Sequence, residues 1–159
     1  MNLRVREGTA NDYTDIKNLF TEVHNLHVKN RPDFFKYVEN PFEKERFEEL
    51  LKSSDQKIFV VEDTDSRELV AFCTVQIMTT VNIPILVQSK YAHIDSFGVK
   101  ANYHKKGIGR LLFNHAVDYA KSEGASYVQL SVWEFNENAI KFYESMGMST
   151  RNRKMELKL

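Results

Sequence analysis

A strand that runs directly into a glycine-containing loop and then a helix is the feature that most constrains this 159-residue chain. Residues 92–99 have the pattern of a strand, and the loop after them holds Gly107 and Gly109. The next segment has apolar residues on one helical face and Gly124 as its C-terminal cap. A further strand is predicted at 127–133. Two strands joined through a helix form a parallel crossover, so the fold must contain a sheet with a parallel pair.

The remaining elements surround this crossover. Thr9 and Asp12 have the spacing of a capping box at the start of a helix, and Met155, Leu157 and Leu159 alternate with charged residues as in a strand. No linker, repeat or low-complexity tract divides the chain, which predicts a single domain over residues 1–159 of the α/β (α+β) class, with a mixed sheet and helices on both faces. The other predicted elements are strands at 3–6, 58–61, 69–81 and 150–159 and helices at about 10–28, 42–51 and 136–146.

Charge and cysteine content exclude several classes of partner. The 22 basic and 22 acidic side chains cancel, so no global field attracts nucleic acid or an acidic membrane. Cys73 is the single cysteine and is expected to be a small core residue, not a nucleophile. The charged start of the chain lacks an apolar signal segment, and no apolar run approaches the roughly 20 residues that cross a bilayer. We therefore expect a cytoplasmic protein with no membrane partner.

The loop at 104–110 has the properties of an anion site. The first N–H groups of a helix have no intrahelical acceptor, and the helix dipole adds positive potential at that end. Lys105, Lys106 and Arg110 add formal charge. A tight turn with solvated lysines would account for the same residues. The loop has neither the third glycine of a Rossmann fingerprint nor the Gly-Lys-Ser/Thr end of a P-loop.

Residues 94–148 closely resemble the paired core motifs of the GNAT superfamily of acetyl-CoA-dependent N-acetyltransferases. The first motif is the glycine loop after a strand that ends in valine. His104 stands where the family usually has Arg or Gln, and Lys105 stands where Gly is common. The second motif is an Asn-x-x-Ala-x-x-x-Tyr spacing followed by a glycine and an apolar residue; here these are Asn136, Ala139, Tyr143, Gly147 and Met148.

The resemblance implies a mostly antiparallel, twisted sheet of about six to seven strands with helices on both faces, and acetyl-CoA as co-substrate. Backbone groups at the end of the motif strand would bond the pantetheine arm, and the loop amides would bond the pyrophosphate. Asn136 would bond the pantetheine region, and it could equally be the N-cap of its helix. The implied cofactor-binding residues are Phe97, Gly98, Val99, His104, Lys105, Lys106, Gly107, Ile108, Gly109, Arg110 and Asn136.

The chemistry of acetyl transfer requires an acid and a base. Neutralising an amine of pKa about 10.4 at pH 7 costs roughly 4.6 kcal/mol, and the departing thiolate needs a proton or a strong hydrogen bond. Tyr143 lies where the family has its proton donor, although it could also be a core aromatic residue. For the base, His93 and Asp95 are the candidates, because His93, Asp95, Phe97 and Val99 should alternate onto one face of their strand. Water alone could also accept the proton, and Asp95 could instead recognise a cationic acceptor.

The leading hypothesis is an N-acetyltransferase for a primary amine of a small molecule or a protein. The alternatives are a catalytically silent acyl-CoA-binding or regulatory domain and a phosphate-binding module without acyl transfer. A monomer or a homodimer is compatible with the sequence. No metal is expected, because His24 and His27 have helical spacing but no third ligand. One aromatic cluster could line an acceptor pocket, form a lid or pack in the core: Phe34, Phe35, Tyr37 and Phe42.

Overall fold

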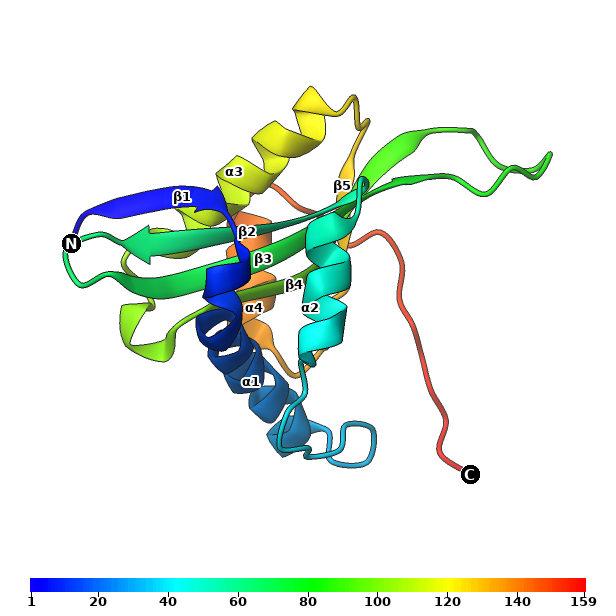
Figure 1. Cartoon of the computed structure of the whole chain (residues 1–159). Helices are drawn as coiled ribbons and strands as arrows, with labels where there is room; N and C mark the ends of the chain where they lie inside the picture. Colours follow the sequence, from blue (N-terminus) through cyan, green and yellow to red (C-terminus); the bar gives the residue numbers. More distant parts are fainter.

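Five strands form one sheet in the order β1-β2-β3-β4-β5 in the computed structural model, which describes residues 1–159 (Figure 1). The first four strands pair antiparallel, and β5 pairs parallel to β4. The predicted parallel crossover is therefore confirmed. The strands are β1 (Leu3–Glu7), β2 (Gln56–Asp63), β3 (Glu68–Thr79), β4 (Lys90–Val99) and β5 (Val128–Leu130).

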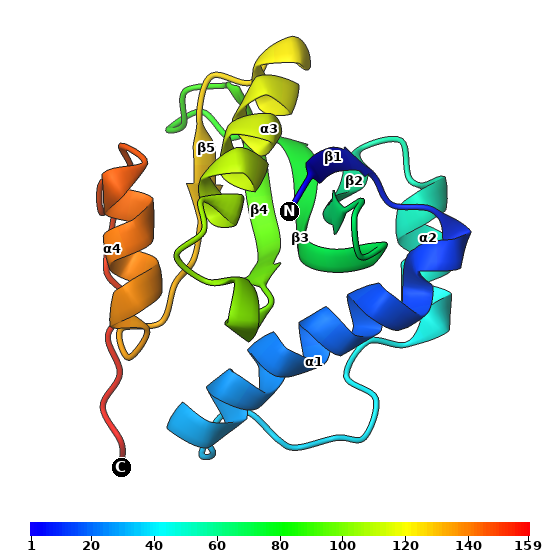
Figure 2. The ribbon, with the colours of Figure 1, turned by 90° about the vertical axis from the view of Figure 1, so that its left-hand side faces the viewer.

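Helices cover both faces of the sheet, as predicted (Figure 2). One core, under α1 and α2, is centred on Ile16, Phe47 and Phe72. The other, under α3, is centred on Cys73 and Leu112, and residues of α4 pack at its margin. No helix is both long and apolar enough to cross a bilayer. The helices are α1 (Tyr13–Asn30), α2 (Lys44–Lys52), α3 (Ile108–Ser122) and α4 (Glu137–Ser145).

Local signals set the helix ends. The capping box of Thr9 and Asp12 is present, in a short 3-10 turn (Ala10–Asp12) that leads into α1. The buried Asp12 carboxylate also accepts two bonds from Arg6, at 2.7 and 2.9 Å. Gly124 and Gly147 follow α3 and α4 with φ of 80° and 97°, the left-handed conformation expected of a C-terminal cap. The predicted capping box and the predicted cap at Gly124 are confirmed.

The strand count is lower than the six to seven predicted. Residues 150–159 are not a strand, and β5 covers only Val128–Leu130 of the predicted 127–133. The reason is the lack of a partner, because strand geometry is stabilised by a neighbouring ladder. Residues 149–159, here called the tail, make no backbone hydrogen bond and run away from the body (Figure 1).

The loop between β3 and β4 projects beyond the sheet (Figure 1). Its residues 80–89, here called the arm, are closed by a bond from the Thr80 N–H to the Ser89 carbonyl at 2.9 Å. In the middle of its length, β4 contains a bulge. Thr74 pairs with Ser96 and Val75 with Ile94, so Asp95 is an extra residue without a partner on β3.

Candidate functional site

The loop before α3 presents a run of free backbone donors. Gly107 is the N-cap of α3 with φ of 79°, in the left-handed region that favours glycine. The amides of residues 105–110 have no hydrogen-bond acceptor in the protein. Six consecutive N–H groups at the positive end of a helix form a site that can bind a phosphate group.

Side chains around this loop have separate tasks. The His104 ring lies with Nε2 2.7 Å from the Val99 carbonyl, so it donates to that oxygen and closes the turn. Lys105 has a positive φ of 60°, which is the conformation that a glycine would adopt without strain. The Lys106 ammonium lies 4.9 Å from the centre of the Tyr103 ring. Lys105, Lys106 and Arg110 are exposed and leave the loop positive.

The strand that precedes the loop has an open edge. β5 pairs with β4 only at Ala92, His93 and Ile94, so β4 has no partner on that side from Asp95 onward. The Lys100 N–H donates to the Val70 carbonyl on β3. By antiparallel alternation the backbone groups of Gly98 also face β3, whereas those of Phe97 face the open edge. Phe97 thus offers both a donor and an acceptor to an extended ligand.

Two glycines of the site are required by packing. A Cβ on Gly98 would lie 2.7 Å from Val23 Cγ2 on α1 and 3.0 Å from Phe72 Cε1. A Cβ on Gly109 would lie 3.2 Å from Phe142 Cζ on α4. These close approaches dock α1 on β4 and α4 on the start of α3.

Asn136 is the N-cap of α4, and its Oδ1 accepts from the Ala139 N–H at 3.3 Å. The capping role predicted from the sequence is confirmed. Its side-chain NH₂ group makes no bond within the protein, so it is free to donate to a ligand.

Tyr143 faces the open edge of β4 from α4. Its ring packs at 6.0 Å from Phe97 and 6.3 Å from Phe113, centre to centre. Burial first, and then the neighbouring Cys73, raises the pKa of Tyr143 to about 12. The phenol is therefore protonated at neutral pH. Tyr143 is half-buried, and because no fully buried side-chain oxygen lacks a partner, its unbonded hydroxyl reaches solvent. It is a free hydrogen-bond donor in a largely apolar setting.

The predicted alternation of His93, Asp95, Phe97 and Val99 onto one face is wrong. Ala92 and Ile94 face the α3 core, and so do Phe97 and Val99. The bulge at Asp95 causes this, because one extra residue exchanges the two faces of the strand. His93 and Asp95 remain together on the other face, toward α2.

His93 is held by a chain of polar groups. Arg151 donates to Gln129 Oε1 at 3.0 Å, so the Gln129 NH₂ group faces His93 Nδ1 at 3.2 Å. An amide NH₂ can only donate, so Nδ1 is the acceptor and the neutral ring carries its hydrogen on Nε2. In this arrangement the lone pair of His93 is already occupied.

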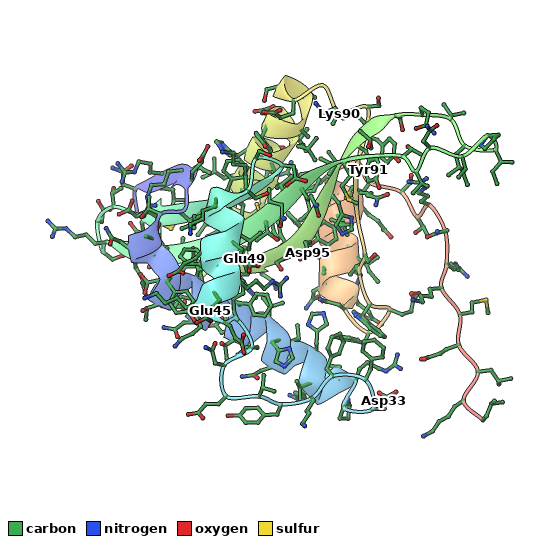
Figure 3. All side chains as sticks on the ribbon, turned by 45° about the vertical axis from the view of Figure 1, so that its right-hand side comes forward. Asp33, Glu45, Glu49, Lys90, Tyr91 and Asp95 are labelled. Carbon is green, nitrogen blue, oxygen red and sulfur yellow. The ribbon has the colours of Figure 1, made fainter.

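Asp95 is exposed and pairs with Arg46 of α2 at 3.4 Å. Both side chains are about half exposed, at 56% and 52%, so water can replace this contact at little cost. Glu45 and Glu49 lie on the exposed part of α2, and Figure 3 shows them on the side of the molecule that carries Asp95. This face of β4 is therefore rich in carboxylates.

The predicted aromatic cluster is divided between two places. Phe42 is buried under α1, stacked at 5.0 Å on Phe20. Phe34 and Phe35 instead pack at 5.0 and 5.3 Å from Trp133, which follows β5, and Tyr37 is exposed. A third aromatic contact, between His27 and Phe135 at 5.4 Å, joins α1 to the same loop.

The remaining polar candidates have structural contacts. His24 and His27 bond the carbonyls of Lys36 and Val23, at 2.9 and 2.7 Å. Cys73 is fully buried, and burial raises the pKa of its thiol to about 12. The prediction that Cys73 is a core residue is confirmed.

Three residues of this site were not predicted: Arg46, Gln129 and Arg151. Each acts on His93 or Asp95 from a distant part of the chain. Only the register of β4 and β5, which pairs His93 with Gln129, could have revealed one of them.

Comparison with known proteins gives consistent results. The model of the acetyltransferase (GNAT) family matches residues 20–148. The crystal structure of a mutant of the BH1408 protein from Bacillus halodurans is 31% identical and superposes with a TM-score of 0.95, covering 98% of this chain and 99% of that one. An uncharacterized N-acetyltransferase of Methanocaldococcus jannaschii is 24% identical over 92% of this chain. The L-ornithine N5-acetyltransferase NATA1 of Arabidopsis thaliana is 25% identical over 76% of this chain. The chain spans 61% and 50% of the lengths of these last two relatives.

Proposed function

This chain belongs to the acetyltransferase (GNAT) family, and we propose that it acts as a single N-acetyltransferase domain over residues 1–159. It transfers the acetyl group of acetyl-CoA to a primary amine of a small molecule or a protein by direct attack. The observation that carries this proposal is the run of six free amides at residues 105–110, beside the open edge of β4. A phosphate group and an extended arm of one ligand fit these two features together.

The residues present fit such a ligand. The loop amides, with Lys105 and Arg110 beside them, would hold its pyrophosphate. The backbone of Phe97 and the NH₂ group of Asn136 would hold its pantetheine arm. Acetyl-CoA supplies an activated thioester, and the role of the chain is to orient it and to move protons.

Tyr143 is assigned the acid role. Its pKa of about 12 keeps the hydroxyl protonated. A thiol has a pKa of about 8.5, so complete transfer from such a phenol to a thiolate is uphill by roughly 5 kcal/mol. Tyr143 therefore stabilises the departing sulfur by a strong hydrogen bond, and the proton released by the attacking amine completes the thiol.

The base role is assigned to Asp95, directly or through water. Because Nδ1 of His93 accepts from Gln129, His93 is not assigned the base role. Arg46 shows that a cation can sit beside Asp95. The carboxylates of Glu45, Glu49 and Asp95 would favour a cationic acceptor, which agrees with the relative named for L-ornithine.

The test has two parts. Calorimetry with CoA and acetyl-CoA should give saturable binding, and a double variant with Gly107→Ala and Gly109→Ala should weaken it at least about tenfold, because both changes disturb the loop. A free-thiol assay against a panel of mono- and polyamines should then show turnover. Absence of CoA binding would overturn the proposal. Binding without turnover on any amine would instead indicate a silent acyl-CoA-binding domain.

A further inference from the structure

Thr74 is one of three polar or charged residues that are buried in this chain, and it lies on the central strand of the sheet. Its neighbours on β3, Cys73 and Val75, face the α3 core, so Thr74 faces the opposite side, toward α1 and α2. A buried hydroxyl group is costly unless it forms a hydrogen bond. The partner of this hydroxyl therefore indicates why a polar residue stands here.

The partner of the Thr74 hydroxyl is the backbone of the bulge in β4. The Ser96 N–H donates to Thr74 Oγ1 at 3.0 Å. At this point two residues of β4, Asp95 and Ser96, lie opposite one residue of β3, so the one-to-one match of N–H groups and carbonyls is broken. The hydroxyl oxygen of Thr74 is an additional acceptor at this place in the ladder. Thr74 thus stabilises the bulge itself.

A preference for strand formers does not by itself explain a threonine at this position. Valine has the same shape, is buried more readily and is equally suited to a strand. A valine at position 74 would have no oxygen, and the Ser96 N–H would lose this acceptor. Threonine and valine therefore differ here in one respect, which is whether the side chain holds the bulge.

The bulge determines the geometry on both sides of β4. It leaves Asp95 without a partner on β3, and the Asp95 carboxylate points toward α2 (Figure 3), where it pairs with Arg46 at 3.4 Å. The bulge also sets the faces of the next residues, so that Phe97 faces the α3 core and Gly98 packs on α1. One buried hydrogen bond is therefore connected to the proposed base and to the strand edge proposed for the pantetheine arm.

We propose that Thr74 is a positioning residue for acetyl transfer, because its hydroxyl oxygen holds the bulge of β4 and thereby fixes the direction of the Asp95 carboxylate. This inference rests on the proposed function, since it concerns the base of that reaction. Thr74 contacts neither substrate in this role, and no proton passes through it. Loss of the hydroxyl allows Asp95 to take other directions, so the chemical step slows. The amides at 105–110 belong to a separate loop and keep their hold on the pyrophosphate.

Thr74→Val removes the oxygen and keeps the shape of the side chain. With an amine that the wild type acetylates, kcat should fall by about 10- to 100-fold, because a misplaced base reacts slowly. Calorimetry should give a dissociation constant of acetyl-CoA within about threefold of the wild-type value. Thr80→Val is the matched control, because that hydroxyl donates to the Ser89 carbonyl in the arm, and its kcat should be that of the wild type. A T74V enzyme with wild-type kcat would overturn the inference.

Thr74→Ser and Thr74→Ala separate the oxygen from the methyl group, and they give the same comparison if T74V folds poorly. T74S should keep kcat within about threefold of the wild type, and T74A should lose as much as T74V. Equal losses in T74S and T74A would assign the effect to the packing of the methyl group and overturn the inference.

Hydrogen exchange of the Ser96 amide tests the bond without any substrate. The exchange should be faster in T74V and T74A than in T74S and the wild type, because the first two lack the acceptor. Equal exchange in all four proteins would show that the hydroxyl does not hold the bulge and would overturn the inference.

The failure of this inference differs from the failure of the proposed function. A wild type that neither binds acetyl-CoA nor acetylates any amine would overturn the proposed function and the role of Thr74 with it. An active wild type whose kcat is unchanged by loss of the hydroxyl would overturn the role of Thr74 alone.

Discussion

The two sides of β4 are built in different ways. Toward the loop and α4, the site consists of a continuous stretch, Phe97 to Arg110, whose functional groups are mainly backbone amides. Toward α2, it consists of His93 and Asp95, whose partners Arg46, Gln129 and Arg151 come from three separate parts of the chain. The first side depends on local conformation, and the second depends on the register of strands and on exposed side chains.

This difference has a functional meaning. A backbone site tolerates side-chain changes, which suits a ligand that is common to a whole family. A side-chain site can be altered one residue at a time, which suits an acceptor that differs between relatives. We call the side toward the loop and α4 the cofactor side, and the side toward α2 the acceptor side. Changes in backbone conformation should affect the cofactor side most, and changes in charge should affect the acceptor side most.

The largest effect is expected on turnover, when the Tyr143 hydroxyl that faces the open edge of β4 is removed. Tyr143→Phe should lower kcat by about 10² to 10⁴, because it removes the donor to the departing sulfur and keeps the ring. Steady-state kinetics at saturating acetyl-CoA measures this. Tyr103→Phe is the matched control, because that hydroxyl bonds Glu68 outside the site. A Y143F enzyme with wild-type turnover would remove Tyr143 from the mechanism.

The second-largest effect is expected on the stability of the fold, from a substitution at Gly98 on the cofactor side. Gly98→Ala should destabilise the fold by about 1 to 3 kcal/mol, because the new methyl group would lie 2.7 Å from Val23. Denaturant unfolding gives the free energy. Val23→Ala should relieve the clash, so the double variant should be less destabilised than the sum of the two single variants. Additive losses would mean that α1 does not press on β4 at this point.

On the acceptor side, a change of charge should alter the kinetics with the amine and leave the stability of the fold unchanged. Asp95→Asn should reduce kcat/KM for a diamine by about tenfold while leaving the dissociation constant of acetyl-CoA within about twofold. Arg46→Gln should act in the opposite direction on KM, because it removes the cation that competes for Asp95. If the two variants changed KM in the same direction, the assignment of Asp95 to the acceptor would fail.

The smallest effect concerns alkaline pH. Tyr143 and Cys73 both have a pKa raised to about 12 by burial, so the folded chain holds protons that the unfolded chain releases. Their contribution to stability is complete below about pH 9 and is lost as the pH rises toward 12. Unfolding at a series of pH values should show this decline, and the decline should be shallower in Tyr143→Phe. Equal slopes would indicate that the phenol is not shielded from water.

The parts of the molecule that follow local rules could be predicted from the sequence. The glycines at 107, 124 and 147 mark helix ends because each needs a positive φ, and Asn136 caps its helix through its own side chain. The bulge at Asp95 could not be predicted, since it depends on Thr74 Oγ1 accepting the Ser96 N–H at 3.0 Å from another strand. The strand predicted at 150–159 is wrong, because its alternating pattern does not supply a neighbouring strand and the tail has no backbone partner.

The extra residue in β4, Asp95, determines which face of the sheet each later side chain of the strand points to. A regular pleat over the same residues, without the bulge, would turn the end of β4 over, because Phe97 is three residues after Ile94 and both face the α3 core. The Phe97 ring would then press against α1, and Gly98 would leave a hole beneath α3. Deletion of Asp95 would instead remove the bulge and leave Phe97 and Gly98 on their present faces. The residue at this point can therefore be substituted or lost without inverting the strand, whereas a regular strand of the same length would be inverted.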